Sequence, residues 1–396
     1  MGEVANIPQL RFPEFSNEWE ESKVGKVFKV SAGGDIKTEN VSQIKTDGFP
    51  YPIYANAEKA KGLYGYSNLY KSEANVVTVA GRGVNIGIAH VRLEPFYPIV
   101  RLLVLNPIKD ADVKFWENQL NQLNLFVEST GVPQLTAPQI SSYKVKYPSK
   151  PEQQKIAAFL TAVDNKIEQL SKKQELLGEY KKGLMQQIFS QAIRFKADDG
   201  SDFPDWKEKK LENVLKRTST GLNPRQNFKL GYGENYYVTI KNISNGKLDF
   251  SKCERIDENA MTMIANRSDL SKGDLIMSSI GNVGESYLLD KEPENWNINE
   301  SVFMLRASEL MLPQFLYFII TNEQSKWYLE SNSTGSSFKS IKLGELKLLP
   351  LGLPSLEEQT KIANFLSSID TKIEQVGKQL DESKQFKKAL LQQMFV

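Results

Sequence analysis

Two segments of the chain, 149–190 and 355–396, align with one another without a gap and are identical at about half of their positions. The first reads SKPEQQKIAAFLTAVDNKIEQLSKKQELLGEYKKGLMQQIFS and the second reads SLEEQTKIANFLSSIDTKIEQVGKQLDESKQFKKALLQQMFV. Chance does not produce an ungapped match of this length, so the sequence contains an internal duplication. The chain is therefore ordered as block, repeat copy, block, repeat copy.

Both repeat copies have the apolar spacing of a long helix. Their apolar residues recur largely in alternating steps of three and four, which forms a narrow seam suited to pairing with another helix. The seam residues are Ile156, Leu160, Val163, Ile167, Leu170, Leu177, Leu184 and Ile188 in the first copy, and Ile362, Leu366, Ile369, Ile373, Val376, Leu380, Leu390 and Met394 in the second. Each copy also begins with a serine followed three residues later by a glutamate, Ser149 with Glu152 and Ser355 with Glu358. This spacing predicts a capping box at each helix start.

The order of these segments predicts an α+β fold. We expect two similar α/β globular domains, 1–148 and 191–354, separated by two long helices, 149–190 and 355–396. If the helices pair along their seams, the chain must return, so the helices run antiparallel as a coiled coil. The two domains then lie at opposite ends, related by a pseudo-two-fold axis, and the molecule is a dumbbell.

The two predicted domains resemble each other weakly. Both are rich in Gly, Tyr, Phe and Asn and contain short β-type runs, and both end on a short strand directly before their helix. Both have a tryptophan near the start, Trp19 and Trp206. Both then have a predicted strand that leads into a loop containing glycines, at 76–87 and 275–284, and later a segment with Ser-Thr-Gly, at 129–136 and 333–340. Strongly similar helices beside weakly similar domains indicate that the domains have diverged further.

Composition limits the function classes. The single cysteine, Cys253, excludes a disulfide framework or a cysteine metal cluster within one chain, which favours the cytoplasm. No apolar stretch has the length of a signal peptide or a membrane span. A net charge of +2 gives no generally basic surface, which counts against tight DNA binding by the chain alone. It is compatible with a subunit whose partners supply part of the DNA contact.

No catalytic motif is found in the sequence. The only histidine, His90, lies within the run IGIAHV, where a structural role is favoured over that of a general base. A phosphate loop of the ATPase type and the Pro-Pro motif of amino-methyltransferases are both absent from the sequence. Pro204, Asp205, Glu208 and Lys210 imitate a metal-dependent nuclease pattern, but the two acids are nearly adjacent, whereas such ligands normally lie on separate strands. We therefore expect no catalytic residue and no metal site in this chain.

Residues suited to DNA contact gather in the predicted loops. Arg, Asn, Gln and Ser side chains can bind base edges, whereas Lys mostly contacts phosphate. The candidates are Lys59, Lys61, Arg82, Asn85, Gln134 and Thr136 in the first domain and Arg225, Asn227, Asn282, Ser336, Ser337, Lys339 and Lys342 in the second.

Over its whole length the chain resembles the specificity subunits of type I restriction-modification systems, the HsdS type. The resemblance is carried by the tryptophan openings, by EQ-x-KIA-x-FL starting at Glu152 and Glu358, and by ALLQQMF at 389–395. It implies that two target-recognition domains each bind one half of an asymmetric, bipartite, double-stranded DNA target. It also implies that the helices are a spacer and a platform for two methyltransferase subunits, which methylate adenine, and that restriction subunits can join. S-adenosylmethionine, ATP and Mg²⁺ are then expected on those partners and no cofactor on this chain.

Two other functions stay open at this point. A coiled-coil scaffold joining two ligand-binding domains would have the same order of segments and no dependence on DNA. A metal-dependent nuclease using the acids near Asp205 would cut DNA in the presence of Mg²⁺.

Overall fold

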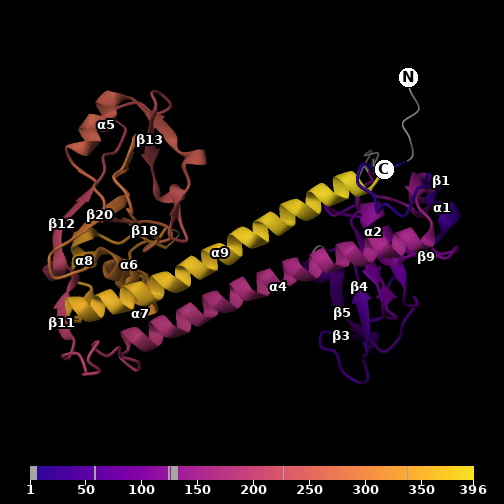
Figure 1. The fold of residues 1–396 in the computed structure, drawn as a ribbon, viewed down its shortest axis with the longest axis horizontal. Coiled ribbons are helices and arrows are strands. Elements are labelled where there is room, and N and C mark those ends of the chain that lie inside the picture. Colours follow the sequence, from indigo (N-terminus) through magenta and orange to yellow (C-terminus); the bar gives the residue numbers. More distant parts are fainter. Residues whose placement is uncertain (1–6, 58, 124, 126–132, 226, 337) are drawn as a thin grey trace. The chain divides into compact units, whose positions relative to one another are not determined.

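The computed structural model describes residues 7–57, 59–123, 125, 133–225, 227–336 and 338–396. Its internal contacts divide the chain into two units. The first unit consists of residues 1–172 and 377–396, and the second unit of residues 173–376. Each unit therefore contains one globular block and part of both long helices, α4 (Lys150–Phe189) and α9 (Leu356–Met394), which are labelled in Figure 1.

The first unit is built on a four-stranded antiparallel sheet. In spatial order its strands are β2 (Phe28–Ala32), β9 (Leu103–Pro107), β6 (Val76–Val79) and β7 (Ala89–Arg92). A second sheet has the order β3 (Val41–Ser42), β5 (Leu63–Ser67), β4 (Tyr51–Tyr54) and β8 (Tyr97–Pro98). The unit also contains the pair β1 (Glu20–Lys23) and β10 (Lys144–Tyr147), and the helices α1 (Val24–Val27), α2 (Val113–Asn121) and α3 (Ala137–Ser142).

The second unit repeats this plan. Its four-stranded sheet has the order β12 (Leu215–Thr220), β20 (Val302–Ala307), β17 (Leu275–Ser278) and β18 (Ser286–Leu288), as Figure 1 shows in part. A three-stranded sheet has the order β16 (Glu254–Ile256), β13 (Asn235–Val238) and β19 (Trp296–Ile298). Two strand pairs are β14 (Ile243–Ser244) with β15 (Lys247–Leu248), and β11 (Lys207–Lys210) with β21 (Pro350–Leu353). Its helices are α5 (Glu258–Ala265), α6 (Pro313–Thr321), α7 (Glu323–Ser331) and α8 (Leu343–Lys347).

The run VVTV of β6 is buried on both faces, which explains why it is continuously apolar rather than alternating. Val77 and Val79 belong to the core that also contains residues of α2, α3 and α4. Val76 instead belongs to a separate cluster with Phe96, against which Tyr54 of the second sheet packs. The sheet β2-β9-β6-β7 is thus covered by helices on one face and by the sheet β3-β5-β4-β8 on the other.

Within each unit the segments of α4 and α9 run antiparallel. In the first unit Lys387 Nζ lies 2.6 Å from Asp164 Oδ1, so the end of α9 lies beside the beginning of α4. In the second unit Lys181 Nζ lies 2.6 Å from Asp370 Oδ1, so the end of α4 lies beside the beginning of α9. The predicted α+β class, with two similar domains and two long antiparallel helices, is confirmed.

Each helix ends on a phenylalanine that completes a core. Phe395, directly after α9, stacks on Phe115 of α2 in the first unit at a ring separation of 5.4 Å. Phe189, the last residue of α4, lies 5.8 Å from Phe315 of α6 in the second unit. The phenylalanine of the Gln-Gln-x-Phe sequence that ends both repeat copies is therefore explained by packing.

A buried glutamate anchors the start of α4. The Glu152 carboxylate accepts hydrogen bonds from Arg11 Nε and Nη2, both at 2.7 Å, and from Trp19 Nε1 at 3.4 Å. Arg11 Nη2 also donates to the Asn17 carbonyl at 2.6 Å. The Glu152 side chain is only 2% exposed, so its charge depends on this bidentate partner. The segment before β1 is thereby held against the helix.

The same cluster recurs at the start of α9. Glu358 accepts from Arg194 Nε at 3.2 Å, from Arg194 Nη2 at 2.9 Å and from Trp206 Nε1 at 3.0 Å. Arg194 Nη2 also donates to the Pro204 carbonyl at 2.7 Å. The Glu358 side chain is fully buried. We call these two arrangements the Arg–Glu–Trp clamps.

The glutamate part of both predicted capping boxes was therefore wrong, and among the described hydrogen bonds the serine part is found in the second copy alone. In the second copy Ser355 Oγ does accept from the Glu358 N–H, at 3.3 Å. The carboxylates of Glu152 and Glu358, however, bind arginine and tryptophan. A guanidinium fork gives a stronger, charge-assisted pair than a backbone N–H, and it lies far away in sequence, where a local pattern cannot reveal it.

The glutamine after each clamp glutamate fastens a second segment. Gln153 Oε1 accepts from the Asp112 N–H at the start of α2, and its Nε2 donates to the Pro148 carbonyl at 2.9 Å. Gln359 Oε1 accepts from the Leu312 N–H at the start of α6, also at 2.9 Å. The repeated Glu-Gln pair thus ties each helix to two separate segments of its globular block.

Replacing Arg11 by methionine should destabilise the first unit by about 3–5 kcal/mol, because it leaves the Glu152 carboxylate buried without its cation. The double variant Arg11→Met, Glu152→Leu should recover much of that loss, since a buried pair can be exchanged for apolar groups at little cost. Denaturant unfolding of the variants measures both effects. Lys378→Met, which breaks only an exposed pair with Glu382, is the control; an Arg11→Met variant as stable as this control would contradict the clamp's role.

Candidate nucleic-acid interface

In the first unit two predicted DNA-binding loops lie side by side. Arg82, in the loop after β6, forms a bridge with Gln134, which lies just before α3. The Leu135 N–H donates to the Gly81 carbonyl at 2.9 Å. A Cβ at Gly81 would lie 3.0 Å from the carbonyl oxygens of both Arg101 and Leu135, which is closer than most Cβ contacts, so this close approach favours glycine.

The second unit brings the corresponding loops together. Ile280, after β17, forms a bridge with Ser340, and the Gly281 N–H donates to the Lys339 carbonyl at 2.8 Å. The Ser279 N–H donates to the Ser301 carbonyl in the turn before β20 at 2.9 Å. The segment pairs that resembled each other in sequence are thus adjacent in both units.

Three polar side chains converge in the first unit. Gln134 Oε1 accepts from Arg82 Nε at 3.2 Å, from Arg82 Nη2 at 3.0 Å and from Arg101 Nη1 at 3.5 Å. We call this set the Arg–Gln cluster. Arg101 was not predicted from the sequence, where it lies in an apolar run before β9.

The turn that carries Arg101 is strained and locked. Val100 and Arg101 have φ values of +53° and +58°, a left-handed conformation that costs on the order of 1–3 kcal/mol for each non-glycine residue. Asn56 holds this turn, because its Nδ2 donates to the Val100 carbonyl at 2.5 Å while its Oδ1 accepts from the Gly81 N–H at 2.9 Å. The strained turn and the loop after β6 are therefore fixed to one another.

The remaining candidates of the first unit lie in different settings. Lys61 is exposed in a tight turn with a φ of +53°, and its carbonyl accepts from buried Arg92 at 2.7 Å. Asn85 is half-buried in the loop after β6. Thr136 is the N-cap of α3 and forms a capping box with Gln139, which gives it a structural role. The side chain of Lys59 lies outside the described residues.

The candidates of the second unit surround the turn before β20. Asn282, Ser336, Lys339 and Lys342 are exposed on or beside the two adjacent loops, and Lys342 is the N-cap of α8. Arg225 and Asn227 are exposed in the loop after β12. That loop reaches the same turn, because Asn223 Nδ2 donates to Glu300 at 2.7 Å. Ser337 lies outside the described residues.

The residues considered for catalysis have structural partners. His90 Nδ1 lies 3.7 Å from Glu117 Oε1. Burial of Glu117 alone would raise its pKa, but the neighbouring His90, the hydrogen bond from the Val91 N–H and the charge of Lys61 together lower that pKa. Asp205 is fully exposed and lies 3.6 Å from Arg194 of the second clamp. Among the described residues, no three His, Cys, Asp or Glu side chains are grouped so as to hold a metal ion.

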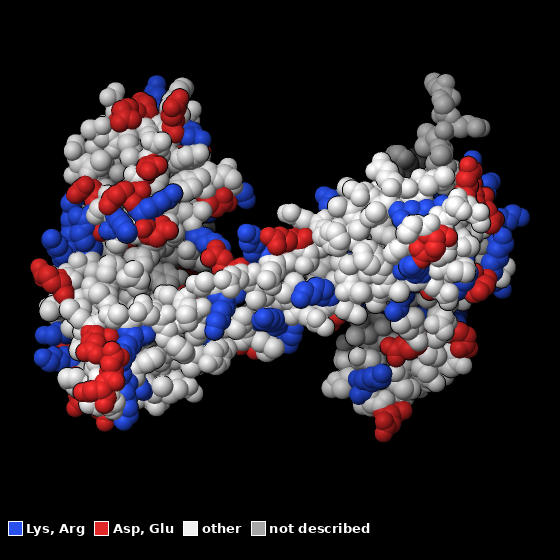
Figure 2. Space-filling view, viewed as in Figure 1, with Lys and Arg blue, Asp and Glu red and all other residues white. Residues whose placement is uncertain are grey.

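Charges of both signs are interspersed on the surface. Figure 2 shows lysine and arginine side chains next to aspartate and glutamate on both units, in agreement with the net charge of +2. None of the helices in the described part of the chain is long and apolar enough to cross a membrane.

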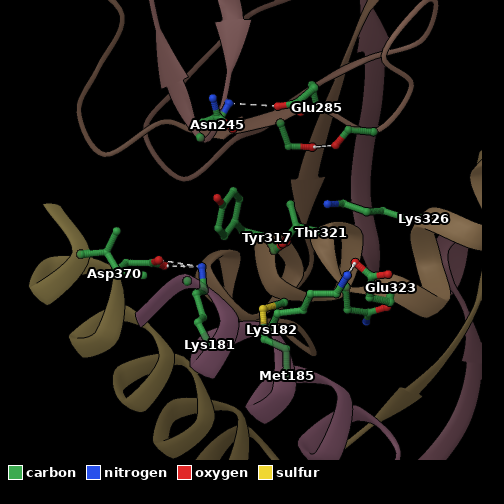
Figure 3. Close-up of a pocket in the computed structure, with 16 residues that line it drawn as sticks. Lys181, Lys182, Met185, Asn245, Glu285, Tyr317, Thr321, Glu323, Lys326 and Asp370 are labelled. Atoms are coloured by element: carbon green, nitrogen blue, oxygen red, sulfur yellow. Dashed lines mark hydrogen bonds and ion pairs between the residues drawn. The ribbon is translucent and has the colours of Figure 1, made fainter. Parts of the chain in front are cut away.

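A pocket of about 340 Å³ in the second unit is lined by α4, α6, α7 and α9, by the turn between β14 and β15, and by residues 284–286 at the start of β18. Figure 3 shows Lys181 paired with Asp370 and Lys182 with Glu323, while Lys326 points into the pocket. The two pairs neutralise most of the lysine charge, which argues against phosphate binding there.

A family model, the type I restriction modification DNA specificity domain, matches residues 16–177 and 204–382. The chain belongs to this family. The type I restriction enzyme MjaVIII specificity subunit of Methanocaldococcus jannaschii is 24% identical over 311 residues, which cover 74% of this chain and 71% of that subunit. The HindI specificity subunit of Haemophilus influenzae is 26% identical over 198 residues, 48% of this chain and 41% of that subunit.

The fold agrees with this assignment. The crystal structure of the type I restriction-modification system S subunit from M. genitalium superimposes with a TM-score of 0.64 at 16% identity, covering 98% of this chain and 99% of that one. The chain is thus a type I specificity subunit, a non-catalytic component whose partner subunits carry out catalysis.

Replacing Thr136 by alanine in this specificity subunit should lower its stability by about 1 kcal/mol, the usual cost of losing a helix N-cap, and leave the recognised DNA sequence unchanged. Thr136→Ser, which keeps the capping hydroxyl, should behave as the wild type. Thermal unfolding and sequencing of methylated genomic DNA test the two statements. A changed target in Thr136→Ala would show that Thr136 contacts DNA as well as capping α3.

Proposed function

We propose that this chain recognises an asymmetric, bipartite sequence in double-stranded DNA, with each unit binding one half-site through the loops described above. It directs adenine methylation by two methyltransferase subunits, which bind S-adenosylmethionine. Restriction subunits add ATP- and Mg²⁺-dependent translocation and cleavage.

One observation carries this proposal: the two units share a sheet order but differ in the loops at the same end of the sheet. Where the first unit has Arg82 and Gln134, the second has Ile280 and Ser340. Two frameworks of the same fold with different loop chemistry fit two DNA half-sites of different sequence, because base edges are distinguished by side-chain donors and acceptors. The near-neutral charge supports a shared DNA contact, in which the methyltransferases supply part of the phosphate binding.

Exchanging residues 1–148 for the equivalent block of a related subunit should change one half of the target and leave the other unchanged. The donor must supply an arginine, a tryptophan and a phenylalanine at the positions of Arg11, Trp19 and Phe115, so that the clamp and the contact with Phe395 survive. The matched control exchanges residues 191–354 and should change the other half. Sequencing of methylated adenines, in these strains and in one lacking the gene, identifies each target.

The outcomes of this exchange separate the possibilities. Loss of one bipartite adenine mark on deletion establishes recognition, and a change confined to one half in each exchange establishes independent half-sites. A methylation pattern that does not depend on the gene would refute the proposal.

The paired helices are proposed to set the spacing between the half-sites. Four residues inserted into both helices, after Lys172 and after Val376, where the units divide, keep each unit's own contacts. The insertion adds about 6 Å and close to one helical turn. We expect unchanged half-sites with a spacer about one or two base pairs longer, measured by methylome sequencing. A two-residue insertion rotates the downstream part of each helix by about 200° and should abolish methylation. If the four-residue variant is active and its spacer is unchanged, the helices do not set the distance between the half-sites.

A further inference from the structure

The Arg–Gln cluster presents hydrogen-bond donors and no free acceptor in its side chains. A guanidinium has no acceptor, and Gln134 Oε1, the one acceptor in the cluster, is occupied by Arg82 at 3.0 and 3.2 Å and by Arg101 at 3.5 Å. An amide recognises adenine only when both its oxygen and its nitrogen are available. The cluster is therefore unsuited to adenine and suited to a group that offers acceptors alone.

Two parts of DNA offer acceptors alone. The major-groove edge of guanine has O6 and N7, which arginine binds in a bidentate manner, and the phosphate backbone has its oxygens. In the described part of the chain neither Arg82 nor Arg101 forms an ion pair with a carboxylate, so the guanidinium N–H groups that do not donate to Gln134 are available for either partner.

Comparison of the two units distinguishes these partners. Val79 pairs with Leu103 in the first unit and Met277 pairs with Phe303 in the second, so Arg101, two residues before Leu103, corresponds to Ser301. The bridge between Arg82 and Gln134 corresponds to the bridge between Ile280 and Ser340. None of the three counterparts carries a guanidinium.

This difference favours a base over a phosphate. The phosphate backbone is chemically the same at both half-sites, so a phosphate site in the common framework would be expected in both units. A base contact has no such requirement, because the two half-sites differ in sequence. The Asn56 contacts also fix the Arg101 turn in advance, which lowers the ordering cost of binding a planar edge.

We infer that Arg82 and Arg101, positioned by Gln134, bind a guanine, and that the half-site of the first unit therefore contains a G·C pair contacted by this cluster. The inference rests on the proposed function, since it names the base chemistry of one half-site.

The test compares Arg82→Lys, Arg82→Ala and Arg101→Ala in the full complex with its methyltransferase. Binding is measured on duplexes carrying each base pair at every position of the first unit's half-site, which the block exchange identifies. We expect discrimination for G·C at one position to fall by on the order of 10- to 100-fold, with the other half-site unaffected. Arg82→Lys should lose this discrimination while keeping the salt dependence of binding, because it retains the charge but not the planar fork. Lys61→Ala, which removes an exposed cation from the same unit, is the matched control and should weaken all duplexes alike.

Three results would overturn the inference. The first is a wild-type half-site for the first unit that lacks a G·C pair. The second is an arginine variant that weakens all duplexes equally and reduces the salt dependence, which would identify a phosphate contact. The third is unchanged discrimination in all three variants. Failure of the proposed function is recognised separately, because the wild-type complex would then show no bipartite preference at all.

Discussion

The buried carboxylate at the start of each long helix is the constraint on which the rest of the structure depends. A carboxylate as buried as that of Glu152 or Glu358 is tolerated only with a bidentate cation and further hydrogen-bond donors. The arginine and the tryptophan that precede each sheet must therefore contact the start of the helix. The next residue, a glutamine, points about 100° further round the helix and holds the loop before α2 or α6. Two fixed directions on one helix turn define how that helix is rotated against its sheet.

This rotation matters because each unit is completed by the far end of the other helix. Leu390, Met394 and Phe395 lie in the core of the first unit, and Met185 and Ile188 lie in the core of the second. A block with its own adjoining helix therefore lacks part of its hydrophobic core. After the duplication, the end of each repeat copy is needed in the core of the unit that contains the start of the other copy. This requirement explains why the ends of the two repeat copies have changed less than the loops.

Sequence periodicity predicted the helices, their antiparallel course and the likeness of the two domains, because these depend on local spacing and on the repeat. It did not predict the clamps. The Glu-Gln pair matched a capping box, and its true partners lie 141 and 164 residues away. The sequence did contain a signal for the clamps, because the dipeptide Arg-Phe occurs at 11–12 and again at 194–195. Phe12 packs on Phe159 of α4, and Phe195 packs on Phe365 of α9. In the candidate site, loop composition found Arg82 and Gln134 but not Arg101, whose direction is set by a left-handed turn that no local pattern indicates.

The buried segments of each unit and its loops differ in how much a substitution lowers the stability of the fold. The clamps and helix ends are buried, so large-to-small substitutions there cost several kcal/mol and the two copies stay alike, whereas buried strands such as β6 (VVTV) and β17 (LIMS) keep mainly their apolar character. The loops after β6 and β17 are held by backbone hydrogen bonds, such as those that Leu135 and Ile341 donate to Gly81 and Ser279, and these bonds are indifferent to side-chain identity. Arg82 and Ile280 can therefore occupy the same bridge position without altering the sheet. A fold in which exposed side chains change freely over a fixed backbone can acquire new DNA targets without losing its stability.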